Sequence, residues 1–222
     1  MANFNTHITV GILVTVVATI SLNHIENVNV LTLSLMTFLG IVASMFPDID
    51  LKTSKPFQFL KLIMYFSIPL FFIYKASINQ IYFLSHFHAS FETLSISIIL
   101  ISLVLNYMFL TLLSSLMIHR GIIHSIPFAF VTSIIVYELA LTLPYHVNSL
   151  YLSLSWLIGF LTHLTLDEMY SVDLMNIKMK KSFGTALSLL KCKNLSGTLL
   201  MYLFLAFYVS TIKDYSFVGK LI

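Results

Sequence analysis

Long runs of apolar residues, separated by short polar stretches, dominate this chain. Runs of roughly 17–25 apolar residues have the length at which a helix crosses the hydrocarbon core of a bilayer. The pattern predicts seven such helices, at residues 7–22, 28–46, 57–76, 93–118, 122–143, 150–167 and 195–212. We therefore expect an all-α integral membrane protein with a single transmembrane helical domain over residues 1–222.

Composition agrees with this pattern, since 58% of the residues are hydrophobic and 9% are charged. These values exclude a soluble domain of ordinary composition. With a net charge of +3, no direct nucleic-acid binding is expected. A secretory signal is the alternative interpretation of the first, shortest run. No Lys or Arg precedes that run and no small-residue cleavage site follows it, so we expect it to be retained.

Basic residues between the predicted helices determine the expected orientation. Counted from the N-terminus, the segments on the N-terminal side carry Lys52, Lys55, Lys61, Arg120, Lys178, Lys180, Lys181, Lys191 and Lys193. The opposite side carries Lys75, Lys213 and Lys220. Because basic loops stay inside, the pattern predicts a bacterial-type inner membrane protein whose N-terminus is cytoplasmic and whose C-terminus lies outside.

Residues that can bind a metal or transfer a proton recur at the helix ends on the predicted cytoplasmic side. They are His7, Asp48, Asp50, His119, His124, His163, Asp167 and Glu168. A hydrophobic chain carries such groups at membrane level when something compensates the cost of desolvating them. Their shared side predicts one common site. The histidines expected on the opposite side, as solvent or headgroup residues, are His24, His86, His88 and His146.

Two of the motifs have spacings that suit metal binding. His163 and Asp167 are four residues apart in a predicted helix, so both lie on one face and could hold a divalent ion such as zinc. A hydrogen bond between the two at a helix end is the alternative. His119 and His124 bracket a predicted reversal between two helices, where Gly121 allows the chain to turn.

Arg120 is suited to bidentate contact with a phosphate or carboxylate, although a purely topological anchor is the alternative role. Pro47 is expected to end the second helix. If residues 48–50 continue as extended chain, Asp48 and Asp50 lie on the same side, where a cation between them would relieve their repulsion. Alternatively, Asp48 caps the next segment and Asp50 is solvated.

Residues 178–193 form a basic segment between the last two predicted helices. Ser182 can cap a short helix here, with Phe183, Leu187 and Leu190 on one face and lysines at both ends. Such a helix would lie in the membrane interface against anionic lipid headgroups. A solvated cytoplasmic loop is the alternative interpretation.

The motifs together resemble a known family. Thr6-His7 with Gly11, then PDID, HRGIIHS and GFLTHLTLDE follow in this order over residues 6–168. They are similar to the LexA-binding, inner-membrane-associated hydrolase family, whose members are YdjM-like. The resemblance implies a membrane-bound, metal-dependent hydrolase that is distantly similar to zinc-dependent phospholipase C and zinc-dependent single-strand nucleases. The implied metal ligands are His7, Asp48, His119, His124, His163 and Asp167, with Asp50 as a further ligand or a supporting group.

Three functions remain open from the sequence. The first is hydrolysis of a phosphoester, such as a phospholipid or lipid-linked phosphate, with one to three divalent ions, zinc being the expected metal. Arg120 would then hold a phosphoryl oxygen, and Asp50 or Glu168 would act as general base. The second is metal or proton transport, although transporter sites usually lie near the bilayer midplane. The third is a non-catalytic, metal-stabilised regulatory protein that docks a cytoplasmic protein partner.

Overall fold

The structure is a computed structural model that describes residues 3–78, 91–116, 121–142, 148–173, 178–179, 184–190 and 195–211. The described residues form seven α-helices, one short 3-10 helix and one pair of two-residue strands. They pack as two compact units. The first unit contains Met1–Pro47 and Arg120–Ile222, and the second contains Asp48–His119.

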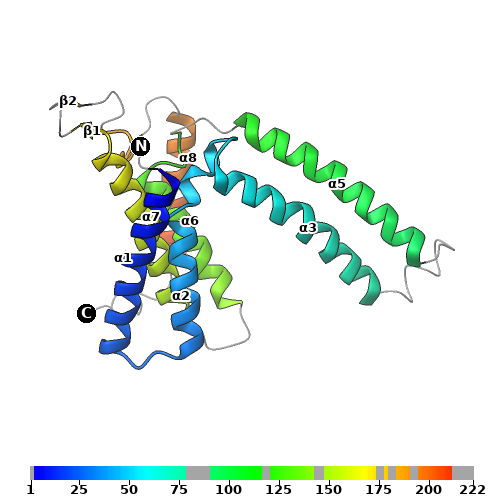
Figure 1. Ribbon diagram of the computed structural model, residues 1–222, viewed down its shortest axis with the longest axis horizontal. Helices are drawn as coiled ribbons and strands as arrows, with labels where there is room; N and C mark the ends of the chain where they lie inside the picture. Colours follow the sequence, from blue (N-terminus) through cyan, green and yellow to red (C-terminus); the bar gives the residue numbers. More distant parts are fainter. Residues whose placement is uncertain are drawn as a thin grey trace. The chain divides into compact units, whose positions relative to one another are not determined.

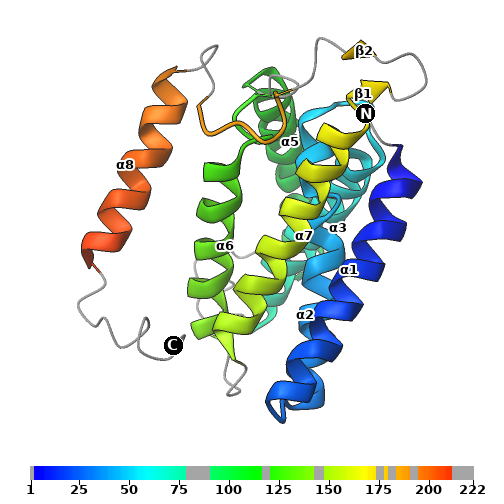
Figure 2. The same ribbon diagram turned by 90° about the vertical axis from the view of Figure 1, so that its left-hand side faces the viewer.

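The first unit is built around helix α7 (Figure 1). Its helices are α1 (Phe4–Ile25), α2 (Val30–Ala43), α6 (Ile126–Leu141), α7 (Ser149–Met169) and α8 (Leu195–Thr211). Helix α7 packs against α1, α2 and α6, and α8 packs against α6 (Figure 2). After α7, strands β1 (Val172–Asp173) and β2 (Lys178–Met179) pair in antiparallel fashion.

Capping side chains define where three of these helices begin. The side chains of Asn3 and Asn29 accept hydrogen bonds from the backbone N–H groups of Thr6 and Thr32 at the starts of α1 and α2. Ser125 does the same for the N–H of Phe128 at the start of α6. Each cap satisfies a donor that has no partner inside its helix, so polar residues at these positions determine the helix boundaries.

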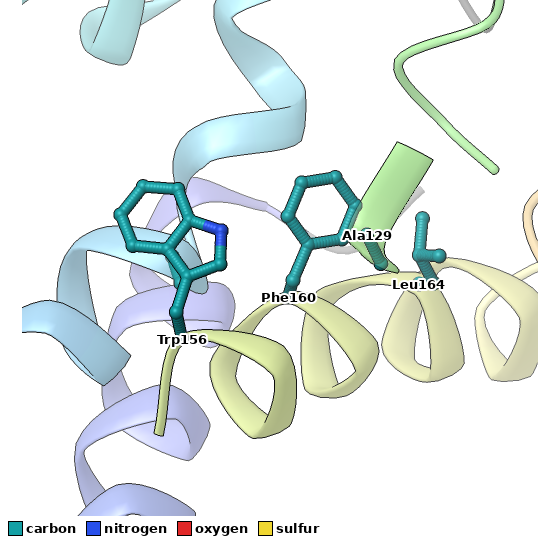
Figure 3. Packing of buried hydrophobic residues seen from close by; sticks show 5 residues of the cluster. Ala129, Trp156, Phe160 and Leu164 are labelled. Atoms are coloured by element: carbon teal, nitrogen blue, oxygen red, sulfur yellow. The ribbon is translucent and has the colours of Figure 1, made fainter. Parts of the chain in front are cut away.

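The apolar core of the first unit lies between α2, α6 and α7. Trp156, Phe160 and Leu164 recur at four-residue intervals on one face of α7 and pack with Ala43 and Ala129 (Figure 3). The indole N–H of Trp156 donates to the Thr132 hydroxyl at 3.0 Å, so the one polar atom of this ring is satisfied in the core.

Small residues let α1, α2 and α7 approach closely. A Cβ atom added at Gly159 would lie 2.0 Å from the carbonyl oxygen of Gly40. A Cβ at Gly40 would meet the Thr15 side chain at 2.4 Å, and one at Gly11 would meet the Ser44 hydroxyl at 2.1 Å. Close backbone contact between small residues is the usual way in which helices associate in a membrane, where apolar burial provides little driving force.

The second unit contains helices α3 (Lys55–Ile78) and α5 (Phe91–Leu116), which pack side by side. The 3-10 helix η1 (Phe46–Asp50) leads into it, and the Ser54 hydroxyl then accepts the Phe57 N–H at 3.2 Å near the start of α3. Within the helix pair, the Asn106 side chain donates to the Met64 carbonyl at 3.3 Å.

Two local predictions are wrong. Residues 46–50 form a 3-10 helix rather than extended chain after Pro47, so Asp48 and Asp50 do not lie on the same side. Residues 184–190 form turns and bends rather than a helix. The reason is that Gly184 has a φ of +77° and that the carboxylate of Glu168 takes up the N–H groups of Gly184 and Ala186.

Each of the seven apolar runs coincides with a described α-helix, to within a few residues at its ends. Within the described residues, three helices have the length and hydropathy to cross a membrane, and they comprise Phe4–Ile25, Lys55–Tyr74 and Ser149–Met169. Three further helices, Val30–Ala43, Ile126–Leu141 and Leu195–Ser210, are shorter, and the 26-residue helix α5 contains the apolar stretch Ser95–Thr111. Large apolar side chains such as Leu13, Val17 and Phe66 are exposed on the helix surfaces, as lipid-facing residues are. That the chain crosses the membrane seven times remains a prediction.

Candidate metal centre

Four of the sequence-predicted residues meet inside the first unit. His7 comes from the first turns of α1, His124 immediately precedes the cap of α6, and His163 and Asp167 lie one turn apart near the end of α7. Their side chains are 0–1% exposed. The convergence that the sequence predicted for these four residues is therefore present in the structure.

Asp167 lies between two imidazoles. One of its carboxylate oxygens is 3.4 Å from His7 Nε2, and the other is 3.8 Å from His124 Nε2. The rings of His7 and His163 stack with centroids 3.9 Å apart, and the His124 ring meets His163 edge-on at 5.4 Å. A carboxylate buried this deeply needs a compensating charge or hydrogen bonds, and a bound cation would supply that charge.

A backbone carbonyl sets the orientation of His163. Nδ1 of this ring lies 2.8 Å from the carbonyl oxygen of Ser44, which can only accept a hydrogen bond. The neutral ring must therefore carry its proton on Nδ1 and its lone pair on Nε2. Histidines that bind metals are typically held in this way, with the second ring nitrogen donating to a carbonyl or carboxylate.

The Ser44 carbonyl is available because α2 ends there. The last carbonyls of a helix have no partner within it, and the next residues offer no regular replacement because Pro47 has no N–H group. Gly40 and Gly159, one turn before Ser44 and His163, bring α2 and α7 into backbone contact. The same close packing thus places the carbonyl beside the imidazole.

The donor set fits a divalent metal ion. His124, His163 and Asp167 each offer one ligand atom, and these three atoms lie within 4.8 Å of one another. His7 adds a third imidazole against the same carboxylate. Imidazole nitrogens with one carboxylate oxygen are ligands that zinc binds in four-coordinate sites. The residues present therefore fit the metal that the sequence implied.

The other predicted site residues are Asp48, Asp50, His119, Arg120 and Glu168. Asp48 and Asp50 belong to the second unit, where Asp48 is half-buried and Asp50 is buried. His119 and Arg120 lie outside the described residues. The carboxylate of Glu168 accepts hydrogen bonds from the N–H groups of Gly184 and Ala186, the second at 3.2 Å. Roles for Asp48, Asp50, His119 and Arg120 stay predictions.

Sequence reasoning missed the contribution of Ser44 to the site and the hydrogen-bond partners of Glu168. Ser44 acts through its backbone, which no side-chain motif reveals; a helix end just before Pro47 was the available signal. Glu168 was expected, as an alternative to Asp50, to act as a base; in the structure its carboxylate accepts the backbone N–H groups of Gly184 and Ala186. The glycine at position 184, which can adopt a positive φ, was the signal for a turn there.

Comparison with known proteins gives one match. The family model of the YdjM inner membrane protein matches residues 1–213. No curated protein and no solved structure matches the chain, so similarity to zinc-dependent phospholipase C stays a prediction. The family match covers almost the whole chain, including all four residues of the buried cluster, and it agrees with the apolar helices. The chain belongs to the YdjM inner membrane protein family.

Proposed function

We propose that this protein is a membrane-bound, metal-dependent hydrolase whose substrate is a phosphoester, such as a phospholipid or a lipid-linked phosphate. The observation that carries the proposal is the buried cluster of His7, His124, His163 and Asp167. Three imidazoles around one carboxylate, with the tautomer of His163 set by the Ser44 carbonyl, match the way proteins hold a catalytic or structural metal.

In this proposal the four cluster residues hold the metal, with zinc as the expected ion. Asp48 and His119 are further predicted ligands, and Asp50 is a further ligand or a supporting group. A divalent ion bound here would supply a Lewis acid for a phosphoryl group and would activate water as a nucleophile. The protein contributes the ligands, their orientation and a site enclosed by helices.

The chain also offers groups for handling substrate. Arg120 is the residue proposed to hold nonbridging phosphoryl oxygens, because a guanidinium presents parallel donors to two oxygens at once. Asp50 is proposed as the general base. Glu168 suits that role less well, since its carboxylate already accepts two backbone N–H groups.

The location of the cluster favours a lipid substrate over a transported ion. It lies where α1 and α6 begin and α7 ends, so a helix crossing a membrane would present it at one headgroup layer. With the proposed orientation, this is the cytoplasmic leaflet. Transport sites usually lie near the bilayer midplane, on interrupted helices.

One observation favours a second candidate, a metal-stabilised regulatory protein without catalysis. All four cluster residues are nearly inaccessible to solvent. Structural zinc sites are closed in this way, whereas catalytic sites keep one coordination position open to water or substrate. A cytoplasmic protein partner is part of this second proposal, and turnover distinguishes it from the first.

The test combines metal analysis with a substrate panel. We expect purified wild-type protein to carry a divalent metal and to hydrolyse at least one phosphoester, with activity lost to a chelator and restored by metal. Asp167→Asn should lose both metal and turnover, whereas Arg120→Lys should keep the metal and lose most of the turnover. If metal-loaded wild type hydrolyses none of the phosphoesters, the hydrolase proposal fails and the structural-metal proposal replaces it.

A further inference from the structure

Residues 184–190, here called the strap, form hydrogen bonds with three helices, α6, α7 and α8. The N–H groups of Gly184 and Ala186 donate to the carboxylate of Glu168 at the end of α7. The Ile126 N–H at the start of α6 donates to the carbonyl of Ser188 at 3.3 Å. The Tyr202 hydroxyl of α8 donates to the carbonyl of Leu189 at 3.1 Å. The strap is therefore held in place although it forms no helix.

Two of these attachment points are neighbours of the metal-centre residues in the chain. Glu168 directly follows Asp167, and Ile126 comes two residues after His124. The strap consequently lies at the end of the first unit where α7 ends and α6 begins, as Figure 2 shows. In a membrane, helix ends lie at the level of the lipid headgroups.

The strap turns its apolar side chains outward. The side chain of Ala186 is buried, with 1% of its surface exposed. The side chains of Leu187, Leu189 and Leu190 are 38%, 58% and 62% exposed. A soluble surface gains nothing from adjacent exposed leucines, but the boundary between headgroups and acyl chains does accommodate them. No described residue covers these three leucines, which leaves them open to a membrane surface.

The charge of the flanking sequence identifies the partner. Lysines stand on both sides of the strap, at positions 178, 180, 181, 191 and 193, and the sequence has no Asp or Glu from residue 174 to residue 193. Anionic lipid attracts basic segments next to membrane helices. Apolar side chains at headgroup level, with lysines before and after them in the sequence, are complementary to an anionic bilayer surface.

We propose that the strap is a docking surface for anionic phospholipid headgroups, with Leu187, Leu189 and Leu190 inserted at the acyl boundary. This goes beyond the proposed hydrolase function and holds whether or not the protein is an enzyme. It replaces the interfacial helix expected from the sequence by a fixed, non-helical strap. Through Glu168 and Ile126, lipid contact is tied to the helix ends that carry Asp167 and His124.

The test uses the full-length protein and its single cysteine. Cys192 lies two residues after the strap, so an environment-sensitive fluorophore on its thiol reports there without an engineered site. The labelled protein is placed in nanodiscs of phosphatidylcholine alone or of phosphatidylcholine mixed with phosphatidylglycerol. We expect quenching by acrylamide, a neutral water-soluble quencher, to fall by about twofold or more when the anionic lipid is present.

Two variants test the parts of the surface separately. Replacing Leu187, Leu189 and Leu190 by Ser should raise quenching in both lipid mixtures, because the inserted apolar side chains are then lost. The double variant Lys191→Glu/Lys193→Glu should abolish the dependence on anionic lipid. Its matched control is Lys213→Glu/Lys220→Glu, which changes the charge equally near the C-terminus and should keep that dependence.

Several results would overturn the proposal. One is equal quenching of the wild type in the two lipid mixtures, and another is the same loss of lipid dependence in both charge-reversal variants. Protection of the label by a soluble cytoplasmic protein, with no effect of lipid, would assign the strap to a protein partner instead. If the leucine variant does not fold, the lipid comparison and the two charge variants still decide the question.

Discussion

Asp167 is the residue whose burial most needs an explanation, because a carboxylate loses much of its solvation energy when it leaves water. Its two oxygens face His7 and His124, and His163 lies one turn away on the same helix. Neutral imidazoles alone do not balance its charge. A divalent cation held by the same side chains would balance the charge of the Asp167 carboxylate, so metal binding explains the cluster with the fewest assumptions.

The first prediction concerns His124. We expect His124→Ala to weaken the binding of divalent metal by at least about 100-fold, since disturbing only the outer partners of a ligand already costs about 10–100-fold. The measurement is elemental analysis of purified protein, followed by a competition titration with a coloured chelator. Metal binding and folding are linked, so both must be done on protein shown to be folded.

The matched control for this prediction is His24→Ala. His24 is an exposed histidine near the opposite end of α1, away from the described cluster. Its replacement should leave the metal content unchanged. Equal metal content in the wild type and in both variants would remove the cluster as a metal centre, whatever its role in folding.

For individual residues, the sequence predicted which side chains form the site, but it did not predict the backbone groups that contact them. His7, His124, His163 and Asp167 could be recognised because apolar helices rarely carry such groups at their ends. The part played by Ser44 could not, because a backbone carbonyl has no signature in the sequence and becomes a partner only through helix packing.

Among the helices, contacts between small residues determine how the site is assembled. Gly40 and Ser44 lie one turn apart at the end of α2. Gly159 and His163 lie one turn apart on α7. Gly40 touches Gly159, and Ser44 holds His163. The close glycine contact therefore sets the register that brings the carbonyl to the imidazole.

The second prediction follows from this register. We expect Gly159→Ala to destabilise the protein by about 1–3 kcal/mol, because the new methyl group would overlap a backbone oxygen that cannot move aside cheaply. It should also weaken metal binding by shifting His163 away from Ser44. Unfolding in detergent by heat or denaturant measures the first effect, and metal titration measures the second.

Thr165→Val on the same helix is the control for the glycine substitution. Its side chain is exposed, so we expect a change of no more than about 0.5 kcal/mol. If Gly159→Ala were as stable as this control, α2 and α7 would not be as close as the structure shows, and the explanation of the His163 orientation would fail with it.

The elements themselves were largely predictable, because every long apolar run became a helix. The failures lie where one side chain overrides local preference. Residues 184–190 have a helix-compatible pattern, but Gly184 adopts a positive φ, and the Glu168 carboxylate binds the N–H groups of Gly184 and Ala186 in this turn. After Pro47, a 3-10 helix replaces the expected extended chain, which separates Asp48 from Asp50.

For the whole molecule, the family match and the apolar helices place the chain in a membrane. Three described helices have both the length and the hydropathy to cross it, and three apolar helices, Val30–Ala43, Ile126–Leu141 and Leu195–Ser210, are shorter. A shorter helix can still cross where the bilayer thins or where flanking side chains reach the interface. The number of crossings therefore decides on which side each end of the chain lies.

The last prediction is that the C-terminus lies outside the cytoplasm, because seven crossings from a cytoplasmic N-terminus end there. The lysines at positions 52, 55, 178, 180 and 181 then remain in the cytoplasm, as the positive-inside rule requires. A fusion of alkaline phosphatase to the C-terminus should be active, and a green fluorescent protein fusion there should be dark. Fusions after residue 173, before the seventh predicted crossing, should give the reverse pattern. A fluorescent C-terminal fusion would instead mean either an even number of crossings from a cytoplasmic N-terminus or an N-terminus that lies outside. The basic segments and the metal centre would then have to be reassigned between the two membrane faces.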